Sequence, residues 1–235
     1  MLKHTNIRVQ LIVFVVFALC ISCKKNQIQL SGKFENCTKR YMLLNRIEPD
    51  DVVFLDTVLL LNGSFLHTLT ADETGIYLLK YNDRTLLSFI AAKGDRLQFS
   101  GDAQHLNKTC NIRGNEETRL LLETRRKLNL FYDKTQEWTA IFLQHTYEND
   151  YEQTNARLDS LYRKEFDAHK EYLTQFIHKN KGKLVTLLAF YQKIGNNAFF
   201  EEQKDRVLLQ EIYNGLVLTY PNSIYTADLK EKLEE

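Results

Sequence analysis

Asn62 and Gly63 separate two apolar runs, residues 52–61 and 64–69, that are rich in residues typical of β-strands. An Asn-Gly pair between such runs strongly indicates a two-residue hairpin, because a type I′ turn needs positive φ at both central residues. We therefore predict that the two runs form a β-hairpin. A hairpin alone is not stable in water, so the other apolar runs between residues 28 and 114 must pair with it or pack on it.

Those other runs are short and are separated by turn residues. With the hairpin arms, the predicted strands are Ile28–Glu35, Arg40–Arg46, 52–61, 64–70, Ile76–Tyr81, Leu86–Ala91, Leu97–Ser100 and Thr109–Arg113. Short strands with frequent turns are typical of sandwich or barrel-like folds. We predict an antiparallel β-domain over residues 28–114.

Residues 115–235 have apolar residues at helical spacing. Asn115 is predicted to cap the first helix, with Glu116 and Glu117 favourable for the dipole of its first turn. The first helix is expected to run through Phe131. Further helices are expected at about 135–148, 150–179, 183–194 and 201–219, with a last one ending near Leu233. Short loops make this half a compact helical bundle, so the fold class is α+β.

Residues 1–22 have the pattern of an export signal, with Lys3 and Arg8 before an apolar run that is too short to span a bilayer. Ser22-Cys23 resembles a bacterial lipobox, in which the cysteine is acylated and becomes the first residue of the mature chain. We predict a lipid on Cys23 and a lipidated tether over residues 23–27. An ordinary cleaved signal peptide and an uncleaved anchor are the alternatives.

Several short motifs carry a family resemblance. They are Leu55-Asp56-Thr57-Val58, Asn62-Gly63-Ser64-Phe65, Gly75-Ile76-Tyr77, Lys93-Gly94-Asp95 and Ile112-Arg113-Gly114-Asn115. Together they resemble the β-domain at the N-terminus of many Bacteroidetes lipoproteins, where it precedes a thioredoxin-like domain of the AhpC/TSA or TlpA type. In that family a helical segment joins the two domains, and this chain stops where the thioredoxin-like domain would begin.

The resemblance also has implications for location and modification. Surface-export tags in such lipoproteins are acidic, whereas Lys24-Lys25 is basic, so we expect a protein in the cell envelope that faces the periplasm. Asp56-Thr57-Val58 and Asp159-Ser160-Leu161 resemble the acceptor motif of periplasmic O-glycosylation in that lineage. Thr57, on a strand, is the better candidate of the two.

Cys37 and Cys110 are the cysteines of the mature part, and an exported protein lies in an oxidising compartment. If the first strand runs antiparallel to the last, with Gly32 near Asn115, then Cys37 lies opposite Cys110 and a disulfide would join the ends of the β-domain. Two free thiols are the alternative. A redox-active pair is less favoured, because these residues lack the Cys-x-x-Cys spacing that lowers a thiol pKa.

Catalytic, cofactor and metal motifs are absent from the sequence: it has no Gly-rich phosphate loop, His-Glu-x-x-His or Gly-x-Ser-x-Gly. We therefore expect no cofactor, no metal and no enzyme activity. Glu165 and His169 are four apart on a helix, but one such pair is typical of a boundary contact. His67 and His145 are interpreted as structural. The aromatic stretch from Phe131 to Tyr151 is interpreted as packing rather than a ligand site.

Charge and motif content leave two hypotheses for function. Removing residues 1–22 leaves 29 basic against 30 acidic residues, so nucleic acid is not an expected partner. The first hypothesis is a non-catalytic, periplasm-facing lipoprotein that acts as a binding or interaction module, with the membrane and an envelope protein as partners. The second is an accessory role in periplasmic thiol-disulfide exchange, through Cys37 and Cys110 or a separate thioredoxin-like partner. The lack of Cys-x-x-Cys in the mature chain favours the first.

Overall fold

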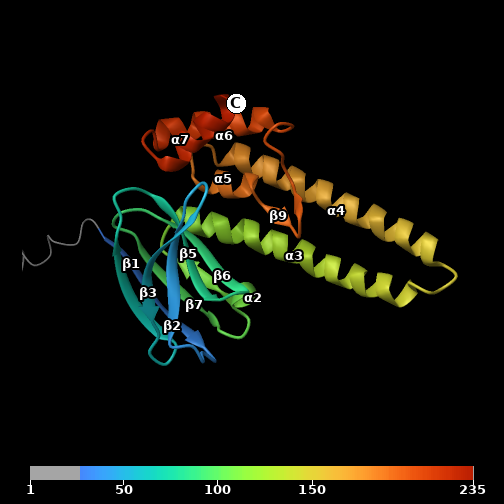
Figure 1. The fold of residues 1–235 in the computed structure, drawn as a ribbon, viewed down its shortest axis with the longest axis horizontal. Helices are drawn as coiled ribbons and strands as arrows, with labels where there is room; N and C mark the ends of the chain where they lie inside the picture. Colours follow the sequence, from blue (N-terminus) through green and yellow to red (C-terminus); the bar gives the residue numbers. More distant parts are fainter. Residues whose placement is uncertain (1–26, 235) are drawn as a thin grey trace, which may run out of the picture.

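The computed structural model describes residues 27–234 and shows a β-sandwich followed by a helical part, as the α+β prediction expects (Figure 1). One sheet has the strand order β4-β1-β7-β8 and the other β3-β2-β5-β6. All neighbouring strands of the sandwich are antiparallel except β1 and β7, which are parallel. The strands are β1 (Gln27–Glu35), β2 (Tyr41–Ile47), β3 (Val52–Leu59), β4 (Ser64–Thr70), β5 (Gly75–Asn82), β6 (Thr85–Ala91), β7 (Arg96–Asp102) and β8 (Asn111–Arg113).

The Asn-Gly turn is formed as predicted, with positive φ at both Asn62 (50°) and Gly63 (77°). The two arms, however, do not pair with each other as a hairpin. Beyond one bridge between Leu61 and Ser64, β3 pairs with β2 and β4 pairs with β1. The hairpin prediction is therefore wrong past the turn. The arms separate because each gains a longer ladder in its own sheet, and the turn joins the two sheets at the edge of the sandwich.

Alternating side chains of the two sheets fill the interior of the sandwich. Phe99 and Phe89 meet there edge to face, with their ring centroids 5.4 Å apart, and Phe65 and Tyr77 pack beside them. Because alternate residues of these strands are buried, their sequences alternate between apolar and polar residues, which is the pattern that predicts a strand.

The second sheet is covered on its outer face as well. Every residue from Gly75 to Leu79 in β5 is buried, because Ile76 and its neighbour Ile90 on β6 belong to the apolar cluster of the helical part. A strand with two buried faces loses the alternation of a half-exposed one. This sheet therefore lies between two apolar cores, that of the sandwich and that of the helical part.

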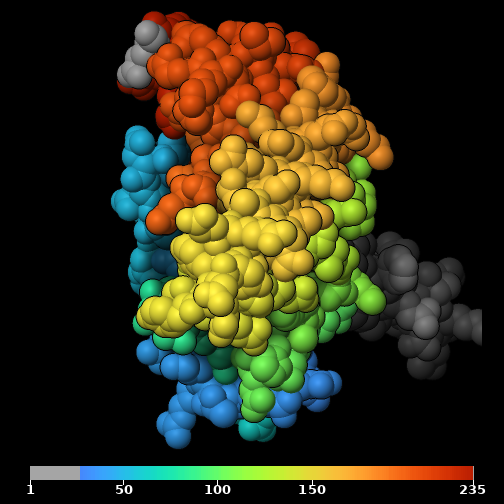
Figure 2. Space-filling view, turned by 90° about the vertical axis from the view of Figure 1, so that its right-hand side faces the viewer, coloured from blue at the N-terminus to red at the C-terminus, as the bar shows by residue number. Residues whose placement is uncertain are grey.

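The first long helix differs from the prediction of two segments. Residues Glu116–His145 form one continuous 30-residue helix, α3, because Tyr132, Asp133 and Lys134 include no helix breaker. The second long helix, α4 (Tyr151–Lys179), agrees with the predicted 150–179. The two form an antiparallel pair that extends well beyond the sandwich in Figure 1, and Figure 2 views this pair from its tip (yellow).

The remaining elements are short. The predicted helix 183–194 ends early, at α5 (Val185–Phe190), and is followed by a small hairpin of β9 (Lys193–Ile194) and β10 (Asn197–Ala198). The other helices are α2 (Leu106–Thr109), α6 (Arg206–Thr219) and α7 (Ile224–Glu234). In residues 27–234 none of the helices is both long and apolar enough to cross a membrane.

Candidate functional site

The cysteines do not take the predicted arrangement. β1 lies between β4 and β7, and β8 lies on the far side of β7, so Gly32 is opposite Phe65 and Phe99 rather than Asn115. The predicted pairing of the first and last strands is wrong, because the parallel strand β7 lies between them. Cys37 and Cys110 are free thiols in the structure.

The two thiols have different surroundings. The Sγ of Cys37 lies 3.7 Å from the hydroxyl of Tyr81, in the segment after β1. Cys110, just before β8, is half-buried against Gly101 and Leu106, and its desolvation raises its pKa to about 11. The thiolate is the reactive form of cysteine, so Cys110 is poorly suited to thiol exchange at neutral pH.

The predicted modification sites are only partly described. Cys23 lies outside the described residues. Thr57 is half-buried on β3, an edge strand, and its backbone N–H donates to the Oδ1 of Asp56 at 2.7 Å. Ser160 is exposed on α4. Both hydroxyl residues therefore lie at or near the surface.

The Glu165 and His169 pair is divided between different partners. Glu165 forms an ion pair with Lys134 of α3 at 2.5 Å, and the Nε2 of His169 lies 2.7 Å from the Oε1 of Gln192. Desolvation lowers the pKa of the buried His169. Within residues 27–234 no group of three or more His, Cys, Asp or Glu side chains could hold a metal ion.

The other two histidines have acidic neighbours. His67 lies 3.6 Å from Asp56, and His145 lies 2.9 Å from Asp150 in the loop between α3 and α4. In the predicted aromatic stretch, Phe131 is buried in the helical core, whereas Tyr147 is 96% exposed. Between them, Trp138 packs against the helical core, and Phe142 lies 5.8 Å from Tyr151 between ring centroids, so most of the stretch contributes to packing.

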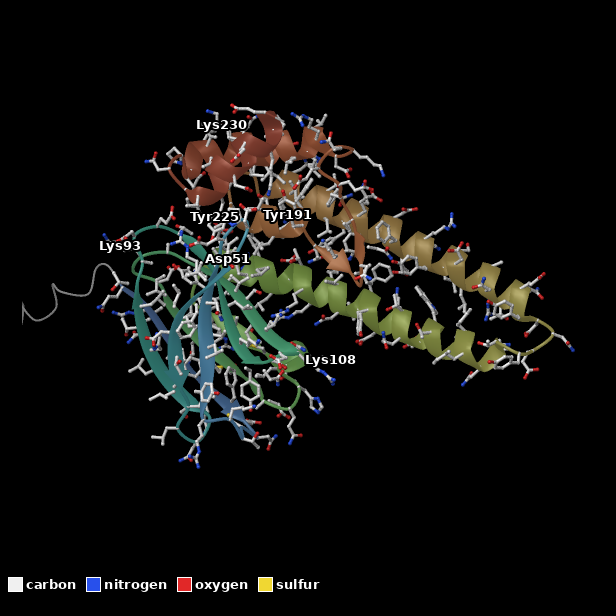
Figure 3. The ribbon with its side chains drawn as sticks, viewed as in Figure 1. Asp51, Lys93, Lys108, Tyr191, Tyr225 and Lys230 are labelled. Carbon is white, nitrogen blue, oxygen red and sulfur yellow. The ribbon has the colours of Figure 1, made fainter. Side chains whose placement is uncertain are left out.

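An apolar pocket of about 210 Å³ lies where the sandwich meets the helices, and it is the candidate binding site. Figure 3 shows Tyr191 and Tyr225, which both line it, close together at this junction. The β2–β3 connection forms one wall and the helices α5 and α7 form the other. The lining residues are Ile47, Glu48, Pro49, Ile76, Leu187, Leu188, Tyr191, Tyr225, Asp228 and Lys232. Pockets at the junction of two structural units are common ligand sites.

Tyr225 fixes α7 against the sheet. Its hydroxyl donates to the carbonyl of Ile47 on β2 at 2.6 Å and accepts from the N–H of Ile76 on β5 at 3.0 Å. Burial raises the pKa of Tyr225, so the hydroxyl keeps its proton at neutral pH and remains a donor. One phenol thus holds the two strands and the helix together below the pocket.

The polar groups at the pocket's other side bond to one another. The hydroxyl of Tyr191 donates to Glu202 at 2.7 Å, and burial followed by this carboxylate raises the pKa of Tyr191 far above its usual range. Lys232 pairs with Asp228 at 2.9 Å and lies over the ring of Tyr191, 5.4 Å from its centroid. These groups are engaged in structural bonds, so the pocket presents mainly apolar surface.

Glu117 connects the start of α3 to the start of α5 and to Tyr220 at the end of α6, and the sequence analysis did not predict this connection. Its carboxylate accepts hydrogen bonds from the backbone N–H groups of Leu184 and Val185 at 3.1 and 2.8 Å and from the hydroxyl of Tyr220 at 2.8 Å. We predicted only that Glu117 favours the dipole of its own helix. Its partners lie more than 60 residues away, so nothing local in the sequence indicates them.

No protein-family model matches the chain, and no curated protein and no solved structure does either. The resemblance to the N-terminal region of thioredoxin-like lipoproteins therefore stays a prediction.

Proposed function

We propose that the protein is a non-catalytic lipoprotein of the cell envelope, anchored by a lipid on Cys23, whose periplasm-facing part acts as a binding module. The junction pocket is the observation that carries the binding role. Its walls come from both halves of the molecule and are largely apolar. A pocket of this kind selects its occupant by shape and apolar contact.

The bonding of the pocket's polar groups supports binding over catalysis. Tyr225 and Tyr191 have raised pKa values and donate their protons to fixed acceptors, Ile47 and Glu202. A general base must be free to accept a proton near neutral pH. These tyrosines instead act as structural donors. The raised pKa of Cys110 likewise gives no support to thiol-disulfide exchange as the function.

The short tether supports a position close to the membrane. The first strand begins at Gln27, four residues after Cys23. Four extended residues span at most about 14 Å. In this proposal the sandwich lies next to the bilayer.

The lipid anchor is tested by mass spectrometry of the protein made in a bacterium that processes lipoproteins. We expect the mature chain to begin at Cys23 and to carry acyl groups, and Cys23→Ser to abolish both the acyl mass and membrane association. Cys20→Ser is the matched control and should be acylated normally. An unmodified Cys23 in the wild-type protein would overturn the anchor.

The pocket is tested with indole as a small apolar probe, followed by NMR of the leucine methyl groups. Indole should shift the methyl signals of Leu187 and Leu188, which line the pocket. Leu188→Trp should fill the cavity and remove the shifts, whereas Leu218→Trp, at a position 87% exposed on α6, should leave them unchanged. Shifts that survive Leu188→Trp would contradict binding in this pocket.

A further inference from the structure

A second cavity, of about 770 Å³, lies between α4 and the β9–β10 hairpin, away from the junction pocket. We call it the α4 groove. Figure 1 shows β9 (orange) beside the two long helices. One side of the groove is a stripe of α4 residues three or four apart, and the other is the small hairpin with Glu201. Its lining residues are Tyr162, Arg163, Phe166, Asp167, Lys170, Asn196, Asn197, Ala198, Phe199 and Glu201.

The floor of the groove is aromatic. Phe166 is half-buried and stacks on the buried Phe199, with ring centroids 4.7 Å apart and an interplanar angle of 28°. Tyr162 lies next to Phe166, at 6.1 Å between ring centroids. Stacking on Phe199 fixes the orientation of the Phe166 ring. The part of the Phe166 ring that remains exposed lies in the groove. A flat apolar surface of this kind can pack against a flat apolar face of a ligand.

The rim of the groove is polar and rich in planar groups. Asn196, Asn197 and Asp167 are exposed. Asn197 donates one N–H to the hydroxyl of Tyr162 at 2.8 Å, which leaves its carbonyl oxygen and its second N–H for another partner. Within residues 27–234 Asp167 forms no ion pair. Its two oxygens can accept two neighbouring donors at once.

The charges of the lining balance. Arg163 and Lys170 are opposed by Asp167 and Glu201. Three of the four are paired outside the lining: Lys170 with Asp205 at 2.9 Å, Arg163 with Asp159 at 2.9 Å and Glu201 with Lys204 at 2.7 Å. Both cations of the lining are thus already neutralised, so the groove has no electrostatic preference for phosphates or other anionic ligands.

We propose that the α4 groove binds a neutral saccharide of two or three sugar units. A sugar ring has an apolar C–H face that can lie on Phe166, and its adjacent hydroxyl groups both donate and accept, as Asp167 and the two asparagines require. The volume lies within the range of about 300–1,000 Å³ that is usual for ligand sites. A purely apolar ligand would leave the polar rim unpaired, which costs binding free energy.

Isothermal titration calorimetry tests this proposal with three neutral trisaccharides, cellotriose, chitotriose and maltotriose, at millimolar concentration. At least one should bind. Asp167→Ala and Asn196→Ala should each weaken that binding about tenfold, the equivalent of one lost hydrogen bond. Lys164→Ala, an exposed change on α4 outside the groove, is the matched control and should bind as the wild type does.

Two further measurements separate the outcomes. Phe166→Ala should also weaken binding, and its thermal unfolding is compared with that of the wild type, because the change also removes packing on Phe199. The two exposed rim variants, Asp167→Ala and Asn196→Ala, are decisive, since they remove no buried group.

The proposal would be overturned if none of the trisaccharides bound, or if both rim variants bound the trisaccharide as tightly as the wild type does. A capped tetrapeptide with two aromatic residues serves as the competing probe, and binding of this peptide alone would also overturn it.

Discussion

At the scale of single residues, the backbone of the turn explains why a glycine follows Asn62. A Cβ on Gly63 would lie 2.2 Å from the carbonyl oxygen of Phe34, and the φ of +77° is itself unfavourable for an L side chain. The carbonyl of Gly63 also accepts from the N–H of Phe34 at 2.9 Å. The sequence indicated the positive φ but not the close contact with β1.

We therefore expect Gly63→Ala to lower the free energy of unfolding by about 2–4 kcal/mol, from the strained φ together with the clash. Gly94→Ala is the control, because Gly94 also has a positive φ (+92°) but has open space where the Cβ would lie. It should lower the free energy by only about 1 kcal/mol. Urea denaturation of the two variants measures the difference, and equal losses would show that the contact with Phe34 is unimportant.

The reactivity of Cys110 should depend on pH. With a pKa of about 11 in place of the usual 9.0, about 1% of this thiol is ionised at pH 9, against half of an unperturbed one. The alkylation rate of Cys110 should therefore keep rising tenfold per pH unit through pH 9 and level off only near pH 11. Peptide mass spectrometry after iodoacetamide treatment measures this rate, with a denatured sample as the reference. A plateau near pH 9 in the folded protein would contradict the raised pKa.

At the scale of elements, the sequence predicted where strands and helices occur better than which strands pair. The Asn62-Gly63 turn, the capping of α3 by Asn115 and the long α4 are confirmed. Strand partners depend on contacts far apart in the chain, so the arms of the expected hairpin and the place of β7 beside β1 could not be predicted. The small β9–β10 hairpin was missed, although Gly195-Asn196 between its strands is a turn signal.

Helix α3 also protects the free edge of β6. The hydroxyl of Thr118 accepts from the N–H of Ile90 at 3.0 Å and donates to its carbonyl at 2.7 Å, as a neighbouring strand would. The amide of Asn115 donates to the same carbonyl at 2.8 Å. An uncovered sheet edge favours aggregation, and at this edge the side chains of Thr118 and Asn115 bond to the backbone N–H and C=O of Ile90 in place of another strand.

We expect Thr118→Val, which keeps the shape of the side chain, to lower the free energy of unfolding by about 1–3 kcal/mol, because the buried N–H of Ile90 then lacks a partner. Thr139→Val serves as the control, since Thr139 is exposed on the same helix and bonds only to the carbonyl of Thr135. It should change the free energy by less than about 0.5 kcal/mol. Denaturant unfolding followed by circular dichroism compares the two variants. If Thr118→Val left the free energy of unfolding unchanged, α3 would not replace a strand at this edge.

At the scale of the whole molecule, the two halves predicted as separate regions are joined by shared packing and by a few bonds. The apolar cluster of the helices includes Ile76 and Ile90 from the sheet. Tyr225 and Thr118 add hydrogen bonds across the junction, to Ile47 of β2 and to Ile90 of β6. Nothing local in the sequence indicated the pocket, because its lining comes from four separate segments.

Removing one of these bonds should weaken the junction. We expect Tyr225→Phe to lower the free energy of unfolding by about 1–3 kcal/mol, since the carbonyl of Ile47 and the N–H of Ile76 lose their partner inside the protein. Tyr147→Phe, at a position 96% exposed, should have no measurable effect. Thermal unfolding of the pair gives the comparison. Equal midpoints would show that this phenol does not stabilise the junction.

The order in which the chain visits the two sheets has a consequence for how the protein is made. Strand β1 belongs to one sheet, β2 and β3 to the other, β4 returns to the first and β5 crosses again. Residue 91 ends the last strand of one sheet, while β1 gains its parallel neighbour only from residues 96–102. As the chain is synthesised from its N-terminus, one sheet therefore cannot be completed before residue 91 and the other cannot be completed before residue 113. Strand β1 remains without its parallel neighbour for most of that time.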